Sequence, residues 1–357
     1  MRVLALNAGS SSLKVAVSDH ASGEPLLRIH AERLLTPHAT LTIGEADPLS
    51  APATLEGVVD AVASAVLDTT PGPDVVVHRI VHGGPKHHRP TVVDDDVVAD
   101  LDEVVALAPL HQPPALETLA RARTQWPDAR HVACFDTAFH ADLPEVSRRL
   151  PVSETLRSQG VRRYGFHGLA VQSVLLARPD LTDLVVAHLG SGCSVTAVGG
   201  DRLPRHTSMA FSPDSGMMSA TRTGDLDPEI LLYLIERHGH SPADLREEVN
   251  RRSGLAGVSG GVRDMRDLLA SQAPDSRLAV EMFVSSAAMA VAAAATTLDQ
   301  WSHLVFTGGV GEHSAEIRDR IRARLRLGGV QDHVVHVDEE RVMDREARLL
   351  TGPGSGR

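Results

Sequence analysis

Cysteine, lysine and asparagine are scarce in this chain. Its 357 residues include only two cysteines, Cys134 and Cys193, and only two lysines and two asparagines. Two thiols in apolar, strand-like contexts exclude a disulfide framework and predict a reducing, cytoplasmic compartment. The net charge of −11 and the lack of a basic run exclude a protein that tracks nucleic acid.

Long hydrophobic runs are equally rare. The longest, Ala279–Leu298, is mostly alanine and contains Glu281, whereas a membrane span needs about 20 strongly apolar residues. We therefore expect a packed interior helix and no membrane partner. Asn7 interrupts the apolar residues at the N-terminus, so no signal peptide is expected.

Strand-like and helix-like segments alternate along the chain, which is typical of an α/β fold. Val75–Val81 is nearly all apolar, as in a parallel strand buried on both faces. The length suits two domains. Other expected strands are Leu26–Leu34, Ala39–Ile43 and His131–Phe135, and His333–Leu350 is expected to be a strand followed by a helix. The other main expected helices are Leu55–Leu67, Val97–Ala108, Ala115–Trp126, Leu169–Ala177, Glu229–His238, Pro242–Ser253 and Val262–Ser271.

The opening stretch, Val3–Val17, encloses a turn of small and hydroxyl residues between two apolar runs. Backbone N–H groups and short hydroxyls in such a turn can converge on an anion, because no bulky side chain blocks the approach. Asn7 ends the first run and Lys14 adds a point charge after the turn. A plain hairpin with no ligand is the alternative interpretation.

Two further glycine turns resemble the first. Gly190–Ser194 lies between apolar runs, and Thr307–Glu312 follows an apolar run and precedes a helical pattern. Repeated units of this kind favour a duplicated fold that holds a polyphosphate. No G-x-x-x-x-G-K-[ST] phosphate loop occurs in the sequence.

Three charged residues stand out by their context. Arg79 lies inside an apolar strand, where an arginine needs an anionic partner. Arg222 lies in Arg205–Asp227, a polar segment too long for a passive linker and expected to be an active-site loop. Asp136 ends a predicted strand, where open α/β sheets place their ligands. A surface position or a salt bridge to a neighbouring aspartate for Arg222, and a helix cap for Asp136, remain as alternatives.

Two other patterns are rejected as sites. Gly257–Gly261 matches the G-x-S-x-G motif of serine hydrolases, but that motif requires a preceding strand, which the sequence lacks. His78 and His82 belong to one predicted strand, where residues four apart are separated by about 13 Å. They cannot share a metal ion.

Seven motifs together resemble the acetate kinase family. They run in order along the chain, up to Asp338-Glu339-Glu340 near its end: Asn7-Ala8-Gly9-Ser10-Ser11-Ser12-Leu13-Lys14, His78-Arg79-Ile80-Val81-His82-Gly83-Gly84, Phe135-Asp136-Thr137-Ala138-Phe139-His140, Arg163-Tyr164-Gly165-Phe166-His167-Gly168, His188-Leu189-Gly190-Ser191-Gly192, Thr221-Arg222-Thr223-Gly224-Asp225-Leu226-Asp227-Pro228 and Phe306-Thr307-Gly308-Gly309-Val310-Gly311-Glu312.

The resemblance implies the fold of the acetate and sugar kinase/actin superfamily. In that fold two ribonuclease-H-like domains enclose a nucleotide cleft, here residues 1–141 plus 340–357 and residues 142–339. The resemblance also implies a homodimer and reversible phosphoryl transfer between ATP and acetate, giving ADP and acetyl phosphate.

The same resemblance assigns roles to individual residues. Asn7 and Glu339 would hold Mg²⁺, with Mn²⁺ as the alternative ion. Arg79, Arg222, Asp136 and His167 would be catalytic. The residues expected to bind ATP are Lys14, Ser10, Ser12, His188, Leu189, Gly190, Ser191, Gly192, Asp264, Met265, Arg266, Gly309, Val310, Gly311, Glu312 and His313. Those expected to bind the carboxylate are Arg79, Val81, Leu110, Phe166 and Pro213.

Some positions depart from the family pattern: Ser191, His206, Ala210, Asp214-Ser215 and His313. Because a carboxylate is already ionised at neutral pH, direct in-line transfer needs no general base. Asp136 would then organise metal-bound water and arginine. The alternatives are a propionate or butyrate kinase and, from another class, an actin-like ATPase switch, which has no need of two arginines for a second anion.

Overall fold

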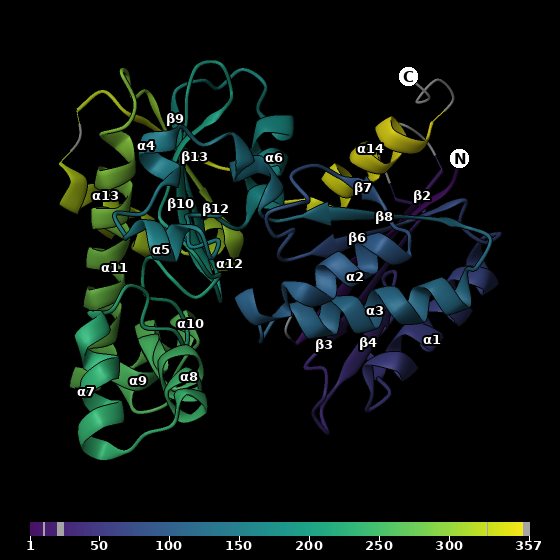
Figure 1. Cartoon of the computed structure of the whole chain (residues 1–357), viewed down its shortest axis with the longest axis horizontal. Coiled ribbons are helices and arrows are strands. Elements are labelled where there is room, and N and C mark those ends of the chain that lie inside the picture. The colour runs from purple at the N-terminus through teal and green to yellow at the C-terminus, as the bar shows by residue number, and fades with distance from the viewer. Residues whose placement is uncertain (10, 20–24, 327, 353–357) are drawn as a thin grey trace. The chain divides into compact units, whose positions relative to one another are not determined.

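A computed structural model describes residues 1–9, 11–19, 25–326 and 328–352. The chain divides into two units. The first contains Met1–Ala141, Gly168–Ser173 and Asp338–Arg357, and the second contains Asp142–His167 and Val174–Val337. Each unit is built on one β-sheet (Figure 1).

The sheet of the first unit has eight strands in the order β5-β4-β3-β2-β1-β6-β8-β7. β1 pairs antiparallel with β2 and parallel with β6, and β6 pairs parallel with β8. The parallel part of the sheet is therefore β1, β6 and β8, whose residues are almost all buried. The strands are β1 (Val3–Ala8), β2 (Ser12–Ser18), β3 (Leu27–Glu32), β4 (Thr40–Ile43), β5 (Leu49–Ser50), β6 (Val75–Ile80), β7 (Thr91–Val92) and β8 (Arg130–Phe135).

Helices cover both faces of this sheet. Leu4 and Leu6 of β1 belong to the core that α1 and α3 complete, as the two-residue period of a strand requires. Asn7 has the opposite parity and faces α14 on the other side (Figure 1). The helices are α1 (Leu55–Thr69), α2 (Asp95–Glu103), α3 (Gln112–Gln125) and α14 (Glu339–Thr351), with 3₁₀ turns η1 (Val105–Leu107) and η2 (Ala138–Asp142).

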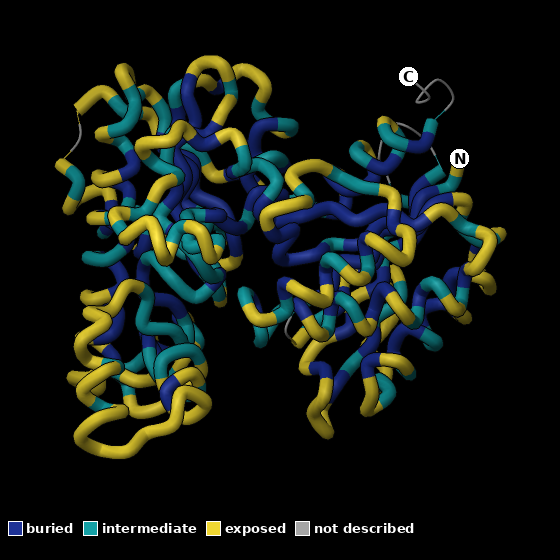
Figure 2. The backbone as a smooth tube through the Cα atoms, viewed as in Figure 1, coloured by how far each residue is buried: buried dark blue, intermediate teal, exposed yellow. Residues whose placement is uncertain are grey.

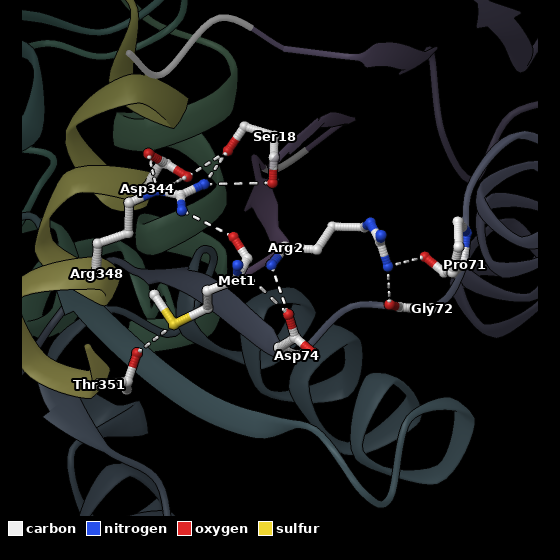
Figure 3. A network of polar contacts seen from close by, with 9 residues as sticks. All are labelled: Met1, Arg2, Ser18, Pro71, Gly72, Asp74, Asp344, Arg348 and Thr351. Carbon is white, nitrogen blue, oxygen red and sulfur yellow. Dashed lines mark hydrogen bonds and ion pairs between the residues drawn. The ribbon is translucent and has the colours of Figure 1, made fainter. Parts of the chain in front are cut away.

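A polar network fixes the register of α14 on the sheet (Figure 3). Arg348 donates from Nε to Asp344, at 2.9 and 3.1 Å, and from Nη2 to the Ser18 hydroxyl of β2, at 2.8 Å. The Ser18 hydroxyl in turn donates to Asp344. Arg348 also donates to the Met1 carbonyl at 2.8 Å. Because the middle of α14 is held in this way, its first turn is placed beside the end of β1.

The sheet of the second unit has five strands in the order β11-β10-β9-β12-β13. β9 and β10 form an antiparallel hairpin, and β12 pairs parallel with β9 and β13. The strands are β9 (Leu184–Leu189), β10 (Cys193–Val198), β11 (Pro204–Thr207), β12 (His303–Thr307) and β13 (Gln331–Val334). The helices are α4 (Glu145–Arg148), α5 (Glu154–Arg157), α6 (Gly168–Ala177, shared with the first unit), α7 (Pro228–His238), α8 (Pro242–Arg251), α9 (Gly254–Ser259), α10 (Met265–Ala270), α11 (Pro274–Ala295), α12 (Gly308–His313) and α13 (Ala315–Leu325).

The helix α11 is the only one in the described part of the chain that is long and apolar enough to cross a membrane. One side of it, including Phe283, Ala287 and Val291, is buried in the core of the second unit. The opposite side carries Glu281, which pairs with Arg320 and Arg324 of α13. Its contacts are those of the interior helix that the sequence predicts.

Helix α7 is unlike the other long helices because it has no buried residue (Figure 2). Its large apolar side chains are exposed by 39–52%: Ile230, Leu232, Tyr233 and Ile235. Single exposed apolar residues are ordinary, but a cluster on one helix marks a surface that binds something.

Several sequence predictions need correction. Thr307–Glu312 is not a free glycine turn, because α12 begins at Gly308. Val97–Ala108 is two elements, α2 and η1, and the segment Arg205–Asp227 begins with part of β11. Residues 168–173, expected in the second domain, belong to the first unit. The reason is local: the Gly168 N–H donates to the Asp136 carbonyl, at 2.9 Å.

Residues 338 and 339 also belong to the first unit and not to the second. Asp338 caps α14 by accepting from the Arg341 N–H at 2.9 Å, and its own N–H donates to the Ser173 hydroxyl at 2.8 Å. Thr351, expected in a disordered tail, is the last residue of α14.

Candidate active site

An arginine and an aspartate form the centre of the polar site in the first unit. Arg79 at the end of β6 donates from Nε to both carboxylate oxygens of Asp136, each at 3.1 Å, and from Nη2 to Oδ2 at 2.5 Å. Asp136 follows β8 directly and is 1% exposed. Parallel pairing of β6 with β8 brings the two strand ends together. The anionic partner that the sequence required for Arg79 is therefore present.

Asn7 links this pair to α14. Its amide nitrogen donates to Glu339 Oε2 at 2.8 Å and to Glu340 Oε1 at 2.6 Å. Its carbonyl oxygen accepts from Arg79 Nη1 at 3.5 Å, and Arg79 lies 4.0 Å from Glu339. The cluster thus contains three carboxylates, one amide and one guanidinium.

The charges of this cluster do not balance. Burial raises the pKa of Asp136 to about 6, against the attraction of Arg79, and Glu339 adds to the rise. Burial, and then repulsion from Glu339, raises the pKa of Glu340. The pKa of Arg79 is raised: burial alone would lower it, but Asp136 and Glu339 outweigh that effect. The excess of negative charge favours an additional cation.

The donor set fits Mg²⁺ or Mn²⁺, because both prefer carboxylate and carbonyl oxygens. Asn7 and Glu339, the two expected ligands, are joined by a hydrogen bond from the Asn7 amide nitrogen, which also donates to Glu340. The Asn7 carbonyl oxygen, the atom that can bind a metal ion, accepts from Arg79, so metal binding requires the amide to turn. Within residues 1–9, 11–19, 25–326 and 328–352, no three His, Cys, Asp or Glu side chains form a complete metal cage. Mg²⁺ typically takes only one or two protein carboxylates and completes its shell with water and phosphate oxygens.

The turn between β1 and β2 is tight. The Gly9 N–H donates to the Ser12 carbonyl at 2.8 Å, and a β-carbon on Gly9 would lie 2.9 Å from the Ser12 hydroxyl. Lys14 pairs with Asn7 across the two strands and is exposed. Ser10, another expected phosphate ligand, lies outside the described residues.

In the second unit two glycine turns are neighbours. The Gly190 N–H donates to the Gly192 carbonyl at 3.1 Å, which closes the β9–β10 hairpin. A β-carbon on Gly190 would lie 3.8 Å from the Gly309 nitrogen. Gly308, with φ +78°, approaches Leu189 so closely that a β-carbon would lie 2.8 Å from its carbonyl oxygen. Parallel pairing of β9 with β12 brings the two turns to the same edge.

His167 lies beside the first of these turns. Its ring centroid is 4.7 Å from that of His188, and its Nδ1 is 3.0 Å from the hydroxyl of buried Ser194. Its φ is +58°, in the left-handed region that non-glycine residues seldom adopt. A β-carbon on Gly192 would lie 3.5 Å from the His167 ring. The backbone strain is thus found at an expected catalytic residue.

Arg222 points to the same turn. Its Nη1 lies 3.1 Å from the position of a β-carbon on Gly192. Its Nε lies 2.9 Å from Asp214 Oδ1, and its Nη1 donates to the Pro213 carbonyl at 3.3 Å. Arg222, His167 and His188 therefore all surround the Gly190–Gly192 turn.

Two residues expected to contact ATP already have structural roles. Asp264 caps α10 by accepting from the Arg266 N–H at 2.9 Å, and it pairs with the Arg266 guanidinium. The Glu312 carboxylate accepts from the Gly308 N–H at 3.0 Å and lies 2.7 Å from His336 Nδ1. Hydrogen bonding, chiefly from Arg266, lowers the pKa of Asp264 to about 2. Of the other expected ATP-contacting residues, Met265 is buried, while Val310 and His313 belong to α12.

The four apolar residues expected around the acyl group are divided between the units. Val81 and Leu110 belong to the first unit, and Phe166 and Pro213 belong to the second. Val81 directly follows β6, two residues after Arg79. The segments bearing Phe166 and Pro213 are adjacent, since the Tyr164 N–H donates to the Ala210 carbonyl at 2.8 Å.

Glu340, Ser194 and Asp214 are not among the site residues predicted from the sequence. A signal for Glu340 exists, because it follows Glu339 directly in the motif Asp338-Glu339-Glu340. Ser194 and Asp214 carry no local signal, since their roles depend on pairings with distant residues. The rejection of the G-x-S-x-G motif is confirmed: Gly257–Ser259 is part of helix α9, and the Ser259 hydroxyl donates to the Val262 carbonyl.

A family model described as the Acetokinase family matches residues 2–348. This chain belongs to the Acetokinase family. An acetate kinase of Deinococcus radiodurans is 39% identical, over 95% of this chain and 88% of its own length.

Among solved structures, a propionate kinase from Francisella tularensis has a TM-score of 0.89 at 28% identity, over 97% of this chain and 99% of that one. An acetate kinase from Porphyromonas gingivalis has a TM-score of 0.85 at 30% identity, over 98% and 99%. The predicted fold class and the resemblance to acetate kinases are confirmed. As an Acetokinase family member, the protein is an ATP-dependent carboxylate kinase.

Proposed function

We propose that this Acetokinase family protein is an acetate kinase, which transfers a phosphoryl group reversibly between ATP and acetate by direct in-line displacement. The observation that carries the proposal is the match to acetate kinases along nearly the whole chain. The buried Arg79–Asp136 pair and the Arg222 cluster support it. In this proposal Arg79 and Arg222, which belong to different units, serve the same reaction.

Positioning and charge stabilisation are what phosphoryl transfer asks of a protein. The forked donors of Arg79 and Arg222 suit the oxygens of a carboxylate and of a migrating phosphoryl group. Asp136, an anion at neutral pH, fixes the Arg79 guanidinium. His167, with Nδ1 bonded to Ser194, presents Nε2 toward the Gly190–Gly192 turn and stabilises charge there.

Asn7 and Glu339 would hold Mg²⁺, with Glu340 next to them. The metal supplies charge neutralisation for the nucleotide phosphates. In the first unit the exposed Lys14 and the turn hydroxyls serve the same phosphates. In the second unit the Gly190–Gly192 turn and the first helical turn of α12, Gly309–Gly311, bind the nucleotide. The neighbouring positions of these two turns support that assignment.

A propionate kinase is the second candidate, favoured by the similarity to the Francisella tularensis structure. The same four residues, Val81, Leu110, Phe166 and Pro213, are proposed to contact the acyl group in either case. An extra buried methylene stabilises binding by about 0.8 kcal/mol where room exists, and overpacking costs about 1–3 kcal/mol where it does not. We expect acetate to be preferred and propionate to be a poorer substrate.

A hydroxamate assay for acyl phosphate, with ATP and Mg²⁺ and with acetate, propionate or butyrate, tests the proposal directly. If kcat/KM were higher with propionate or butyrate than with acetate, that longer carboxylate would be the preferred substrate. Absence of product with all three carboxylates would refute the kinase assignment.

We further propose a homodimer in the cytoplasm, without nucleic acid or membrane partners. The exposed apolar side chains of α7, including Ile230, Leu232 and Tyr233, are the surface that supports dimerisation. Leu232→Asp should shift the sedimentation coefficient to that of a monomer. Val146→Asp, at an isolated apolar residue that is 90% exposed, is the matched control and should leave it unchanged.

A further inference from the structure

The guanidinium of Arg222 is held by two consecutive residues of one loop. Asp214 Oδ1 lies 2.9 Å from Nε, and the Pro213 carbonyl accepts from Nη1. The two charged side chains are mostly buried, with exposed fractions of 17% for Arg222 and 10% for Asp214. A pair so far removed from water is fixed in geometry more firmly than a surface pair.

The backbone of Arg222 is fixed separately. The Ser219 N–H donates to the Arg222 carbonyl at 3.1 Å, and the next residue, Thr223, donates to the Val249 carbonyl at 3.0 Å. Gly254 packs so closely that a β-carbon there would lie 2.7 Å from the Arg222 carbonyl oxygen. What remains variable is the long side chain, whose torsions the backbone cannot set.

Asp214 is itself held rigidly. The Ser215 hydroxyl accepts from the Ala210 N–H at 2.7 Å and donates to the Ser212 carbonyl at 2.8 Å, so the turn around Asp214 is closed. The Asp225 carboxylate accepts from the Gly216 N–H at 2.8 Å, which ties this turn to the segment bearing Arg222. Asp214 is therefore a fixed anchor and not a mobile surface acid.

We propose that Asp214 is a positioning residue for phosphoryl transfer, which orients the Arg222 guanidinium toward the Gly190–Gly192 turn. The inference rests on the proposed function of this site. Contact through Nε directs the distal nitrogens away from Asp214, and Nη1 reaches within 3.1 Å of the β-carbon position of Gly192. Because misplacing a reacting or stabilising group by about 1 Å costs on the order of 10²-fold in rate, this anchor determines turnover.

The opposite role is also chemically reasonable: a carboxylate on Arg222 could compete with the substrate carboxylate. The two roles predict opposite results. Removing an anchor lowers turnover, whereas removing a competitor raises kcat/KM for the carboxylate.

The test uses Asp214→Leu, Asp214→Asn and the double variant Asp214→Leu/Arg222→Leu in the full chain. We expect Asp214→Leu to lower kcat with acetate by about 10–100-fold, with KM for ATP unchanged. Asp214→Asn, which keeps an acceptor oxygen, should lose less. In the Arg222→Leu background, Asp214→Leu should cause no further loss, because the two residues act as one unit. Asp201→Asn, in an exposed pair with Arg205, is the control.

The proposal would be overturned if Asp214→Leu had a higher kcat/KM for acetate than the wild type. It would also be overturned if Asp214→Leu lowered kcat by the same factor in the wild-type and Arg222→Leu backgrounds. A second measurement does not depend on activity. The Arg222 Nε–H resonance in arginine-selective ¹⁵N spectra, assigned by its loss in Arg222→Leu, should show restricted picosecond–nanosecond motion in the wild type and freer motion in Asp214→Leu, because the ion pair holds the guanidinium. Unchanged motion would refute the anchor, whereas failure of the wild type to make any acyl phosphate would refute only the proposed function.

Discussion

Arg79 and Asp136 form a bidentate pair at the ends of two adjacent parallel strands, with Nε 3.1 Å from each carboxylate oxygen. The pair is buried, so each partner depends on the other for compensation of its charge. We predict that Arg79→Leu lowers kcat by about 10²–10³-fold, as expected for a donor aimed at transition-state charge. Asp136→Asn should cause a comparable loss, because it removes the charge that fixes the Arg79 guanidinium, and neither variant should change nucleotide affinity much. Arg121→Leu, in the exposed Arg121–Asp60 pair, is the control. More than about a tenth of wild-type turnover in Arg79→Leu would contradict the role given to Arg79.

The metal prediction concerns Glu339. Since Glu339 contacts Asn7 in a cluster with excess negative charge, Glu339→Gln should raise the Mg²⁺ concentration for half-maximal activity by about 10–100-fold. Glu346→Gln, later on the same helix, should leave it unchanged. Equal Mg²⁺ dependence in the wild type and in Glu339→Gln would remove Glu339 from the metal site. Chelation by EDTA should abolish turnover, with recovery on addition of Mg²⁺ or Mn²⁺.

The third prediction concerns the backbone that supports Arg222. Gly254 has φ +60°, and a β-carbon there would lie 2.2 Å from the Ser219 carbonyl oxygen. Gly254→Ala should therefore displace the Ser219–Arg222 segment and lower both stability and kcat. Gly239→Ala is the matched control: φ is +68°, but nothing lies within 4 Å of the added carbon. Gly239→Ala should lower the free energy of unfolding by only about 1–2 kcal/mol and should leave kcat unchanged. Similar kcat values for the two variants would contradict this account.

The fourth prediction is a dependence of stability on pH. His131 Nε2 is 3.1 Å from the Trp126 carbonyl, so it donates there, and His131 Nδ1 accepts from His78 Nε2 at 3.0 Å. Both rings are thus neutral. Burial is the main cause that lowers the pKa of each ring, and the pKa of His78 lies well below its ordinary value.

Below the ordinary pH of histidine titration, near 6.5, the unfolded chain binds protons that these folded rings do not. Stability should therefore be fully present above about pH 6.5 and should fall as the pH falls, by at most about 1.4 kcal/mol per pH unit for each ring. His78→Gln, which keeps a donor for His131, should reduce this slope in urea-unfolding measurements between pH 5 and 7.5. An identical slope in the variant would show that the His78 ring is not the source.

The positions of buried strands could be predicted from the sequence, because burial requires a run of apolar residues within one short segment. Val75–Val81 and His131–Phe135 are predicted within a residue or two of β6 and β8. Arg79 could be recognised as a site residue because no apolar strand tolerates an unpaired guanidinium. In each case the physical constraint acts within one element.

Contacts between distant elements could not be predicted in the same way. The start of α12 at Gly308 depends on Leu189, whose carbonyl leaves no room for a side chain. Glu312 accepts a hydrogen bond from Gly308 and lies beside His336. Asp214 pairs with Arg222. Both sets of contacts depend on how loops fold back on themselves. No periodicity records such pairings.

The position of α14 has a consequence for folding kinetics. Asn7 is separated from its partners Glu339 and Glu340 by 332 and 333 residues in the sequence. Contacts between such distant residues require the closure of a long loop, which is slow compared with the formation of local structure. Until α14 packs on the first sheet, Asn7 lacks these two acidic partners, so this polar cluster is among the last parts of the fold to assemble.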